Sequence, residues 1–340
     1  MSLLRRKLLC ASIGSASLLG LAAVAAGRSM AAIADRSGLR LHVGAALAFG
    51  TTVSIKVLHE DETIALAAIE HALQQVREID ALMSLQRSAS QVSQLNQRGV
   101  LETAHPHLLQ VLNFSRQLSG LTQGAFDVTV QPLWQAFSSA SAQGRLPTAP
   151  EIALAKSRVD WRRLEITPQR LHLTAPDMAI TLNGVAQGYA VDVAMAALRS
   201  CGAQHALLDT GEFGAIGQKA ANRPWLLGIA DPRQPDALSA TLAMDGRSVA
   251  TSGDYETFFS PDFVYHHIFD PATGRSPTEL AGVTVVAPSG LWADGLSTAF
   301  MVMGADKALA LTAQLPGVDV LLIHKDGAVR KSPQFPQWVA

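Results

Sequence analysis

The order of helical and extended patterns along the chain constrains its fold most strongly. Residues 49–59 alternate apolar and polar side chains as a strand does, and residues 62–82 then carry apolar side chains at helical spacing. Further along, several short apolar runs follow one another with turns between them and no helix. Because helices and strands do not alternate strictly, we expect an α+β fold with mainly antiparallel sheets and flanking helices.

The middle of the chain allows more specific expectations. Short strands are predicted at residues 164–166, 171–173 and 180–182. Residues 83–97 are polar and have no apolar periodicity, and residues 138–150 are small, polar and contain proline. Both of these segments are therefore predicted to be irregular.

The first 34 residues have the layout of an export signal. Arg5 and Arg6 precede an apolar stretch of small residues, and cleavage-site patterns end at Ala25 and Ala34. Paired arginines before a mildly apolar segment indicate the twin-arginine route, which exports folded proteins, so a periplasmic protein is predicted. The alternative is an uncleaved N-terminal anchor, since about 20 apolar residues can span a bilayer.

Composition argues against a nucleic-acid partner and against a fold held by disulfides. The 340 residues are 48% hydrophobic and 16% charged, with a formal net charge of -1. No basic run is present to neutralise phosphates, which argues against nucleic acid as a partner. With Cys10 in the signal, Cys201 remains alone and cannot form an internal disulfide, so an apolar core must hold the fold.

Asp294 and Thr298 are the clearest candidates for a metal site. They lie four residues apart in a predicted helix and so share one face. A carboxylate and a hydroxyl are oxygen ligands of the kind that Mg²⁺ prefers. The alternative, which the residues themselves favour, is that Asp294 caps the helix and Thr298 is only tolerated.

Two further segments carry polar groups suited to a site. Ser252 and Asp254 lie in a predicted turn whose hydroxyls and amides could face an anion, although Ser-Gly-Asp turns are common. His266 and His267 are adjacent, so only one can face a given site, which argues against a zinc pair there and leaves one histidine for proton transfer or phosphate contact.

The stretch TLNGVAQGYAVDVAMAALRSCG, residues 181–202, places glycines where a strand-like run meets a helix. Gly184 and Gly188 fit neither of the common phosphate-binding glycine motifs. Our interpretation is that they let the backbone approach a dinucleotide closely and that the helix after them points its amides at phosphate. The chain has no Gly-x-Ser-x-Gly, His-Glu-x-x-His or Cys-x-x-Cys motif.

Taken in order, six segments resemble the ApbE family, the FAD:protein FMN transferases. They are MSLQRSASQVSQLN (83–96), GAFDVTVQPL (124–133), LNGVAQGYAVD (182–192), SVATSGDY (248–255), HIFDPATGRSP (267–277) and ADGLSTAFMVMG (293–304). The resemblance implies a T-fold-related flavin transferase domain over residues 35–340, either as one body or as two lobes with the site between them. It also implies the reaction, in which FAD and Mg²⁺ bind, FMN passes to a Thr or Ser hydroxyl of a target protein, and AMP leaves.

The resemblance also assigns roles to residues of this chain. His267, Asp254 and Thr298 match catalytic positions, and the metal ligands would be Asp294, Thr298 and the backbone carbonyl of Ala186. The matched FAD-binding positions are Met83, Ser84, Gln86, Asp127, Gly184, Val185, Gln187, Asp209, Glu212, Ser252 and His267.

This chain departs from the family pattern at three places. Gln86 stands where an aromatic residue is frequent, Gln187 replaces a frequent lysine, and residues 209–212 form a segment one residue shorter. These changes resemble an exported branch associated with nitrous oxide respiration, whose target would be a membrane-bound respiratory flavoprotein with a Ser/Thr-Gly-Ala-Ser/Thr acceptor. The alternatives are a non-catalytic FAD-binding protein and a structural assembly factor for a respiratory complex.

Overall fold

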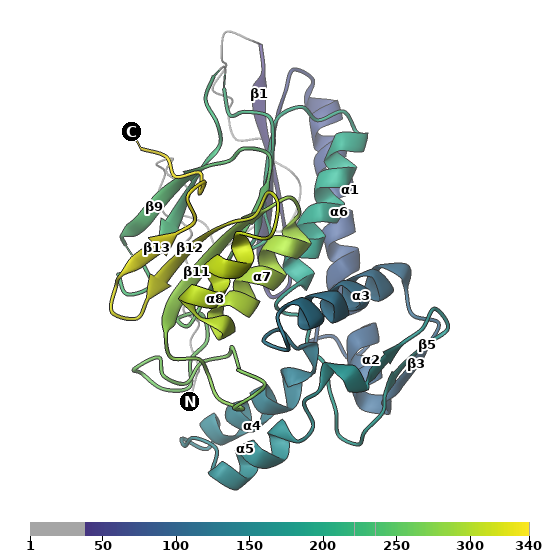
Figure 1. Ribbon diagram of the computed structural model, residues 1–340. Helices are drawn as coiled ribbons and strands as arrows, with labels where there is room; N and C mark the ends of the chain where they lie inside the picture. The colour runs from purple at the N-terminus through teal and green to yellow at the C-terminus, as the bar shows by residue number, and fades with distance from the viewer. Residues whose placement is uncertain (1–37, 221, 235, 340) are drawn as a thin grey trace.

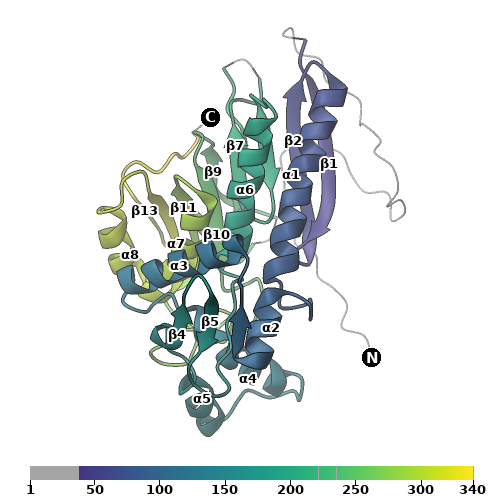
Figure 2. The same ribbon diagram turned by 90° about the vertical axis from the view of Figure 1, so that its right-hand side faces the viewer.

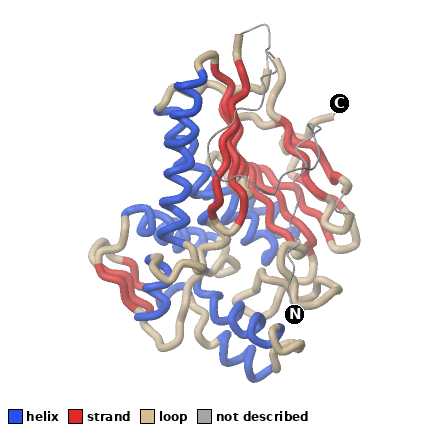
Figure 3. The backbone as a smooth tube through the Cα atoms, turned by 180° about the vertical axis from the view of Figure 1, so that it is seen from behind, coloured by secondary structure: helices blue, strands red, loops and turns tan. Residues whose placement is uncertain are grey.

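An eight-stranded antiparallel sheet is the centre of the computed structural model, which describes residues 38–220, 222–234 and 236–339 (Figure 3). Its strands run in the order β1-β2-β6-β7-β10-β11-β12-β13. Their bounds are β1 (Arg40–Ala48), β2 (Thr51–His59), β6 (Ala206–Asp209), β7 (Phe213–Ile216), β10 (Ser248–Gly253), β11 (Leu280–Ala287), β12 (Asp319–His324) and β13 (Val329–Lys331). The α+β fold with antiparallel strands predicted from the sequence is confirmed.

The first two strands form a long hairpin at one edge of this sheet. Phe49 and Gly50 make its turn, and both have positive φ, 53° and 74°, as two-residue hairpins require. The predicted strand at residues 49–59 therefore begins two residues later, and β1 before it was not predicted. The Phe49 amide donates to Asp80 Oδ1 at 3.0 Å, which fastens the turn to the end of α1.

Helices cover one face of the sheet (Figures 1 and 2). They are α1 (Glu62–Met83), α6 (Ala186–Ser200), α7 (Gly290–Met303) and α8 (Ala305–Thr312). α1 begins at the capping carboxylate of Asp61, which accepts from the amides of Thr63 and Ile64. Its apolar stripe meets the inward side chains of β2, and Val76 and Ile55 there are fully buried.

The other face of the sheet carries a second apolar cluster. The hairpin of β8 (Leu226–Ala230) and β9 (Leu238–Ala243) lies on it, and Trp225 and Leu242 pack against sheet residues such as Val286. Because both faces are covered by apolar layers, β11 is buried along its whole length.

The remaining elements form the lower part of the molecule in Figure 1. They are α2 (Gln91–Arg98), α3 (Pro106–Leu121), α4 (Gln131–Ser141) and α5 (Ala149–Lys156), the short helices η1 (Val128–Val130) and η2 (Trp161–Arg163), and a small sheet of β3 (Val100–Glu102), β5 (Arg170–Leu173) and β4 (Leu164–Ile166). The strands predicted at residues 164–166 and 171–173 are confirmed.

Three local predictions are wrong. Residues 83–97 contain all but the last residue of α2, because Ser90 caps this helix by accepting from the Ser93 amide. Part of the loop predicted at residues 138–150 is helical, since α4 continues to Ser141 and α5 begins at Ala149. Residues 180–182 form no strand, because the Asn96 side chain takes both backbone hydrogen bonds of Ile180.

The predicted export signal lies outside the described residues. Within the described part of the chain, none of the helices combines the length and the apolar character needed to cross a bilayer.

Candidate functional site

The crossing of α6 and α7 brings two predicted site segments together. The Gly188 amide, in the first turn of α6, donates to Asp294 Oδ2 at 2.9 Å. A Cβ at Gly188 would lie 2.2 Å from the Gly290 carbonyl oxygen, so only glycine allows this approach. Gly188 therefore makes room for α7, and its close approach to a dinucleotide stays a prediction.

Asp192, one turn further along α6, holds the start of α7. Its carboxylate accepts from the amides of Gly290 and Leu291 at 2.6 and 2.9 Å. Ser289 is the capping residue of α7 and accepts from the Trp292 amide. Asp294 therefore does not cap the helix, and the capping alternative raised by the sequence is wrong.

Hydroxyl groups gather one turn beyond Asp294. Ser252 Oγ, on β10, lies 3.2 Å from Thr298 Oγ1 and 2.7 Å from Ser297 Oγ. A Cβ at Gly184 would be 2.8 Å from Thr298 Oγ1, so this second glycine leaves space for the threonine. Asp294 and Thr298 thus share the face of α7 that meets the start of α6 and the end of β10.

Val185 sits behind this contact as the N-cap residue of α6. It is fully buried, and its side chain lies against Gly295 of α7. It positions the first turn of α6, so its part in an FAD site would be indirect.

Two buried carboxylates without a cation partner mark the site. Asp294 and Glu212 are only 3% and 8% exposed, and no ion pair to either occurs among the described residues. Burial, with the charge of Asp192, raises the pKa of Asp294 to about 7. Burial also raises the pKa of Glu212, and Asp294 adds to the effect. Such a pair favours a bound cation, which would compensate both charges.

The donor set fits Mg²⁺. The Asp294 carboxylate and the Thr298 hydroxyl are hard oxygen ligands, and Ala186, the first residue of α6, lies two residues before the amide bonded to Asp294. No imidazole or thiolate contacts these groups among the described residues, so nothing in the set prefers a softer metal.

Gln187 joins α6 to the turn between β6 and β7. Its Nε2 donates to the Thr210 carbonyl at 2.6 Å, and Thr210 Oγ1 donates back to the Gln187 carbonyl at 3.3 Å. The Asp209 carboxylate closes the turn by accepting from the Gly211 amide at 3.0 Å. The neutral side chain that the sequence singled out is therefore a structural link beside the buried carboxylates.

The adjacent histidines face different partners, as their spacing requires. His267 Nδ1 lies 3.1 Å from the Thr257 carbonyl, which can only accept, so Nδ1 carries the proton and Nε2 keeps a lone pair. His266 donates from Nε2 to the Pro277 carbonyl, and its Nδ1 is buried without a partner. Burial lowers the pKa of both rings, that of His266 to about 4. Because His266 is fully buried and His267 is not, only His267 can offer its unpartnered nitrogen to a substrate.

Asp254 is held by two cations. Arg233 makes a bidentate pair with it at 2.8 and 2.7 Å, and Lys325 Nζ lies 3.3 Å from Oδ2. Its carboxylate is fully buried. These contacts suit a group that positions its loop, and its predicted catalytic role stays a prediction.

The remaining predicted residues lie in two other places. Met83 is buried at the end of α1, Ser84 caps that helix and accepts from the Gln86 amide, and the Gln86 side chain lies against Gly50. Among the described residues, no hydrogen bond joins this group to Asp294 or Thr298.

Asp127 caps η1 in the lower part of the molecule. It accepts from the amides of Thr129 and Trp161 at 2.7 and 3.0 Å. Burial raises its pKa to about 6 despite these bonds. Its position within an FAD pocket is untested and stays a prediction.

Sequence reasoning missed several residues that shape the site. Ser297, Thr210, Arg233 and Lys325 were not singled out, although each contacts a predicted residue. Ser297 and Thr210 stand next to predicted residues, which was a usable signal. Arg233 and Lys325 lie 21 or more residues from Asp254 in sequence, and only the fold pairs them.

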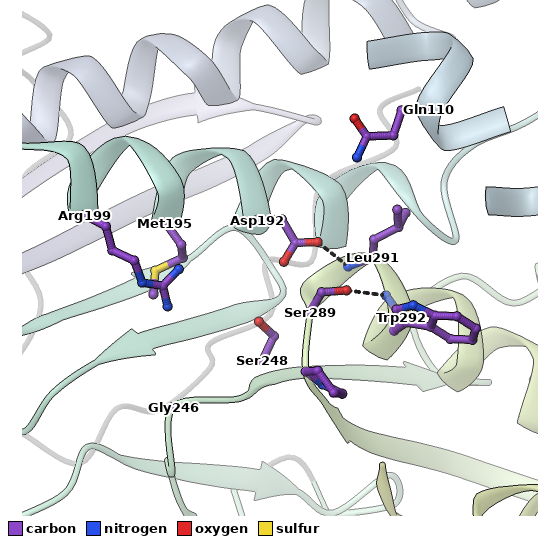
Figure 4. Close-up of a pocket in the computed structure, with 10 residues that line it drawn as sticks. Gln110, Asp192, Met195, Arg199, Gly246, Ser248, Ser289, Leu291 and Trp292 are labelled. Carbon is purple, nitrogen blue, oxygen red and sulfur yellow. Dashed lines mark hydrogen bonds between the residues drawn. The ribbon is translucent and has the colours of Figure 1, made fainter. Parts of the chain in front are cut away.

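A cavity of about 450 Å³ lies beside the site, between α6, the start of α7 and β10 (Figure 4). None of the predicted FAD residues lines it. Asp192 and Ser289 already accept from the free amides at the start of α7, as the dashed lines in Figure 4 mark, so those amides are not available to an anion.

Comparisons with known proteins show the family of this chain. Residues 49–322 match the model of the ApbE family. A Vibrio cholerae protein named FAD:protein FMN transferase is 33% identical over 291 residues, which cover 81% of this chain and 85% of that protein. One from Haemophilus influenzae is 29% identical, covering 92% and 95%. The crystal structure of the ApbE protein of Thermotoga maritima matches with a TM-score of 0.78 at 29% identity, covering 88% of this chain and all of that one.

Proposed function

Because the chain belongs to the ApbE family, we propose that it is an FAD:protein FMN transferase that uses Mg²⁺ to attach FMN to a Ser or Thr hydroxyl of a target protein. The buried carboxylates Asp294 and Glu212, which have no cation partner among the described residues, carry the Mg²⁺ part of this proposal. The chemistry requires the target's hydroxyl oxygen to form a bond to the FMN phosphorus while the pyrophosphate P–O bond breaks. AMP leaves with the bonding electron pair.

Different residues of this chain would bind the metal and accept the proton. Asp294, Thr298 and the Ala186 carbonyl would hold Mg²⁺, which when bound neutralises charge on the pyrophosphate. Because burial lowers the pKa of His267, its ring stays uncharged and Nε2 keeps a lone pair. That lone pair can take the proton of the attacking hydroxyl. The Ser252 hydroxyl, which is itself paired with Ser297, helps to keep the Thr298 hydroxyl in place.

Incubation with FAD, Mg²⁺ and a target carrying a Ser/Thr-Gly-Ala-Ser/Thr segment tests the proposal. Flavin fluorescence that persists on the target in a denaturing gel supports the transferase. Bound FAD without transfer would instead support an FAD-binding protein, and neither binding nor transfer would leave an assembly factor.

His267→Ala separates chemistry from binding. We expect transfer to slow by about a hundredfold while the Kd for FAD changes little, since a positioned base contributes about 10²–10⁴-fold. Equal losses in rate and affinity would make His267 a binding residue. The matched control is His266→Gln, which alters the neighbouring ring, whose unpartnered Nδ1 is buried and so out of reach of a substrate.

We further propose that the protein works in the periplasm on a membrane-bound respiratory flavoprotein. The paired Arg5 and Arg6 before an apolar stretch support export by the twin-arginine route. Replacing both arginines by lysine should keep the protein in the cytoplasm on cell fractionation, whereas unchanged export contradicts the proposal.

A further inference from the structure

Three metal-ligating side chains form a cluster away from the proposed Mg²⁺ site. Glu78 comes from α1, and His105 and His107 come from the start of α3. Each offers one ligand atom, and these atoms all lie within 4.8 Å of one another. His105 Nε2 is 3.6 Å from Glu78 Oε1, and the two imidazole rings stack with centroids 5.1 Å apart. We propose that Glu78, His105 and His107 bind a divalent transition metal, with Zn²⁺ as the best match.

The local sequence explains why the two imidazoles lie together. His105 is the N-cap residue of α3 and has extended backbone angles, and Pro106 begins the helix. His107 follows in the first turn. The His105 amide donates to Gln91 Oε1 at 2.8 Å, which ties this corner to α2. The change from extended to helical backbone at Pro106 therefore places both rings on the side that faces Glu78.

Hydrogen bonds behind His107 set which of its nitrogens is free. The Tyr189 hydroxyl, on α6, donates its proton to Gln110 Oε1 at 2.8 Å. The contact of 2.6 Å between His107 Nδ1 and the same hydroxyl then requires the proton to be on Nδ1. Nε2 keeps the lone pair. A histidine that donates its other ring N–H to such a partner is the usual arrangement in metal sites.

His105 needs one small adjustment. Its Nδ1 accepts from the His107 amide at 3.3 Å, a long bond for a helix cap. To bind a metal through Nε2, the ring must carry its proton on Nδ1 and lose that bond. The contact given up is weak, and the neighbouring carboxylate gains a partner.

The ligand types separate this cluster from the Asp294 site. Two imidazole nitrogens and one carboxylate oxygen are a ligand set typical of Zn²⁺ and other late transition metals, with water at the fourth position. Asp294 and Thr298 offer only oxygen, which suits Mg²⁺. A single chain can therefore offer two sites that prefer different cations.

A metal here would connect three helices. It would link α1 directly to α3, and the bond of His107 to Tyr189 would extend the link to α6. Figure 1 shows α3 beside the lower ends of these two long helices. Because Tyr189 follows Gly188, whose amide binds Asp294, a metal in the cluster would stiffen the turn of α6 that faces the candidate active site.

Zinc titration by calorimetry tests the proposal on the full chain, purified without a histidine tag and treated with EDTA. We expect one Zn²⁺ per chain in the wild type and in Asp294→Asn. Glu78→Gln and His105→Gln should each weaken binding by about tenfold or more. The Glu78 side chain is 44% exposed, so its replacement leaves the fold intact, and circular dichroism checks this.

The matched control is His172→Gln. It removes one imidazole from a surface pair with Glu165, 3.2 Å apart, and leaves the cluster unchanged, so zinc binding should stay at the wild-type level. Cobalt provides a second readout, since Co²⁺ held by these ligands should give visible absorption that Glu78→Gln reduces. Equal zinc affinity in the wild type, Glu78→Gln and His105→Gln, no binding in the wild type, or loss of binding in Asp294→Asn would each overturn the proposal.

Discussion

Two buried carboxylates of this protein differ in whether a cation of the chain pairs with them. Asp254 is fully buried and has Arg233 and Lys325 against its oxygens. Asp294 is almost as buried, yet it has no ion pair among the described residues, and burial with the charge of Asp192 raises its pKa to about 7. Cations of the chain itself compensate the charge of Asp254. No cation among the described residues compensates the charge of Asp294, which indicates that a ligand does so.

The largest effect should come from Asp294→Asn. We expect transfer to fall by about a hundredfold or more, because a bound metal contributes several kcal/mol to such reactions. Thermal stability should not fall, since the change removes a charge that Glu212 repels and keeps an acceptor for the Gly188 amide. The measurements are covalent flavin incorporation against Mg²⁺ concentration and the Tm. Wild-type activity in Asp294→Asn would contradict the inference that Asp294 differs from Asp254 by binding a metal.

His266 shows a third way to bury an ionisable group, which is to keep it uncharged. Burial lowers its pKa from 6.5 to about 4. The unfolded chain takes up a proton as the pH falls through 6.5, whereas the folded protein does not until about pH 4. This residue should therefore reduce the free energy of unfolding by about 3 kcal/mol between these pH values. Denaturant unfolding across this range measures the loss.

A variant identifies the source of that pH dependence. In His266→Gln, which keeps a donor for the Pro277 carbonyl, the slope between pH 6.5 and 4 should flatten. An unchanged slope would assign the acid sensitivity to other groups.

Asp254→Asn should affect stability more than chemistry. Loss of the charge that pairs with Arg233 and Lys325 should cost about 2 kcal/mol, a figure typical of hydrogen bonds to charged groups. Transfer should remain within about tenfold of the wild type. Stability by chemical denaturation and the transfer rate are compared with those of Asp294→Asn. A catalytic Asp254 would show the reverse, with rate lost and stability kept.

The smallest effect is expected at Gln187. Gln187→Lys adds a cation beside the buried carboxylates, and the KM for FAD should fall by about fivefold, as one added charge–phosphate contact contributes about 1 kcal/mol. Because salt screens such a contact, the gain should shrink at high ionic strength. Gln314→Lys, at an exposed position two residues after α8 and outside every predicted site segment, serves as the control. Equal gains in both variants would mean a general charge effect.

Much of the fold could be predicted because it depends on local pattern. The helix over residues 62–82 and the shared face of Asp294 and Thr298 follow from helical spacing alone. The errors arose where a hydrogen bond of a single polar side chain decides the backbone. Asn96 takes the hydrogen bonds that a strand at Ile180 would have needed, and α2 depends on a cap by Ser90 that a polar sequence does not reveal.

The sequence by itself determined the α+β class, the family and the oxygen ligands on one face of α7, because periodicity and motif order are properties of neighbouring residues. Only the tertiary structure decided which charges meet. Arg233 pairs with Asp254, Glu78 lies 3.6 Å from His105, and the charge of Asp294 acts on Glu212. Coulomb energies depend on distance and burial, and both are set only when the sheet and its helices have packed.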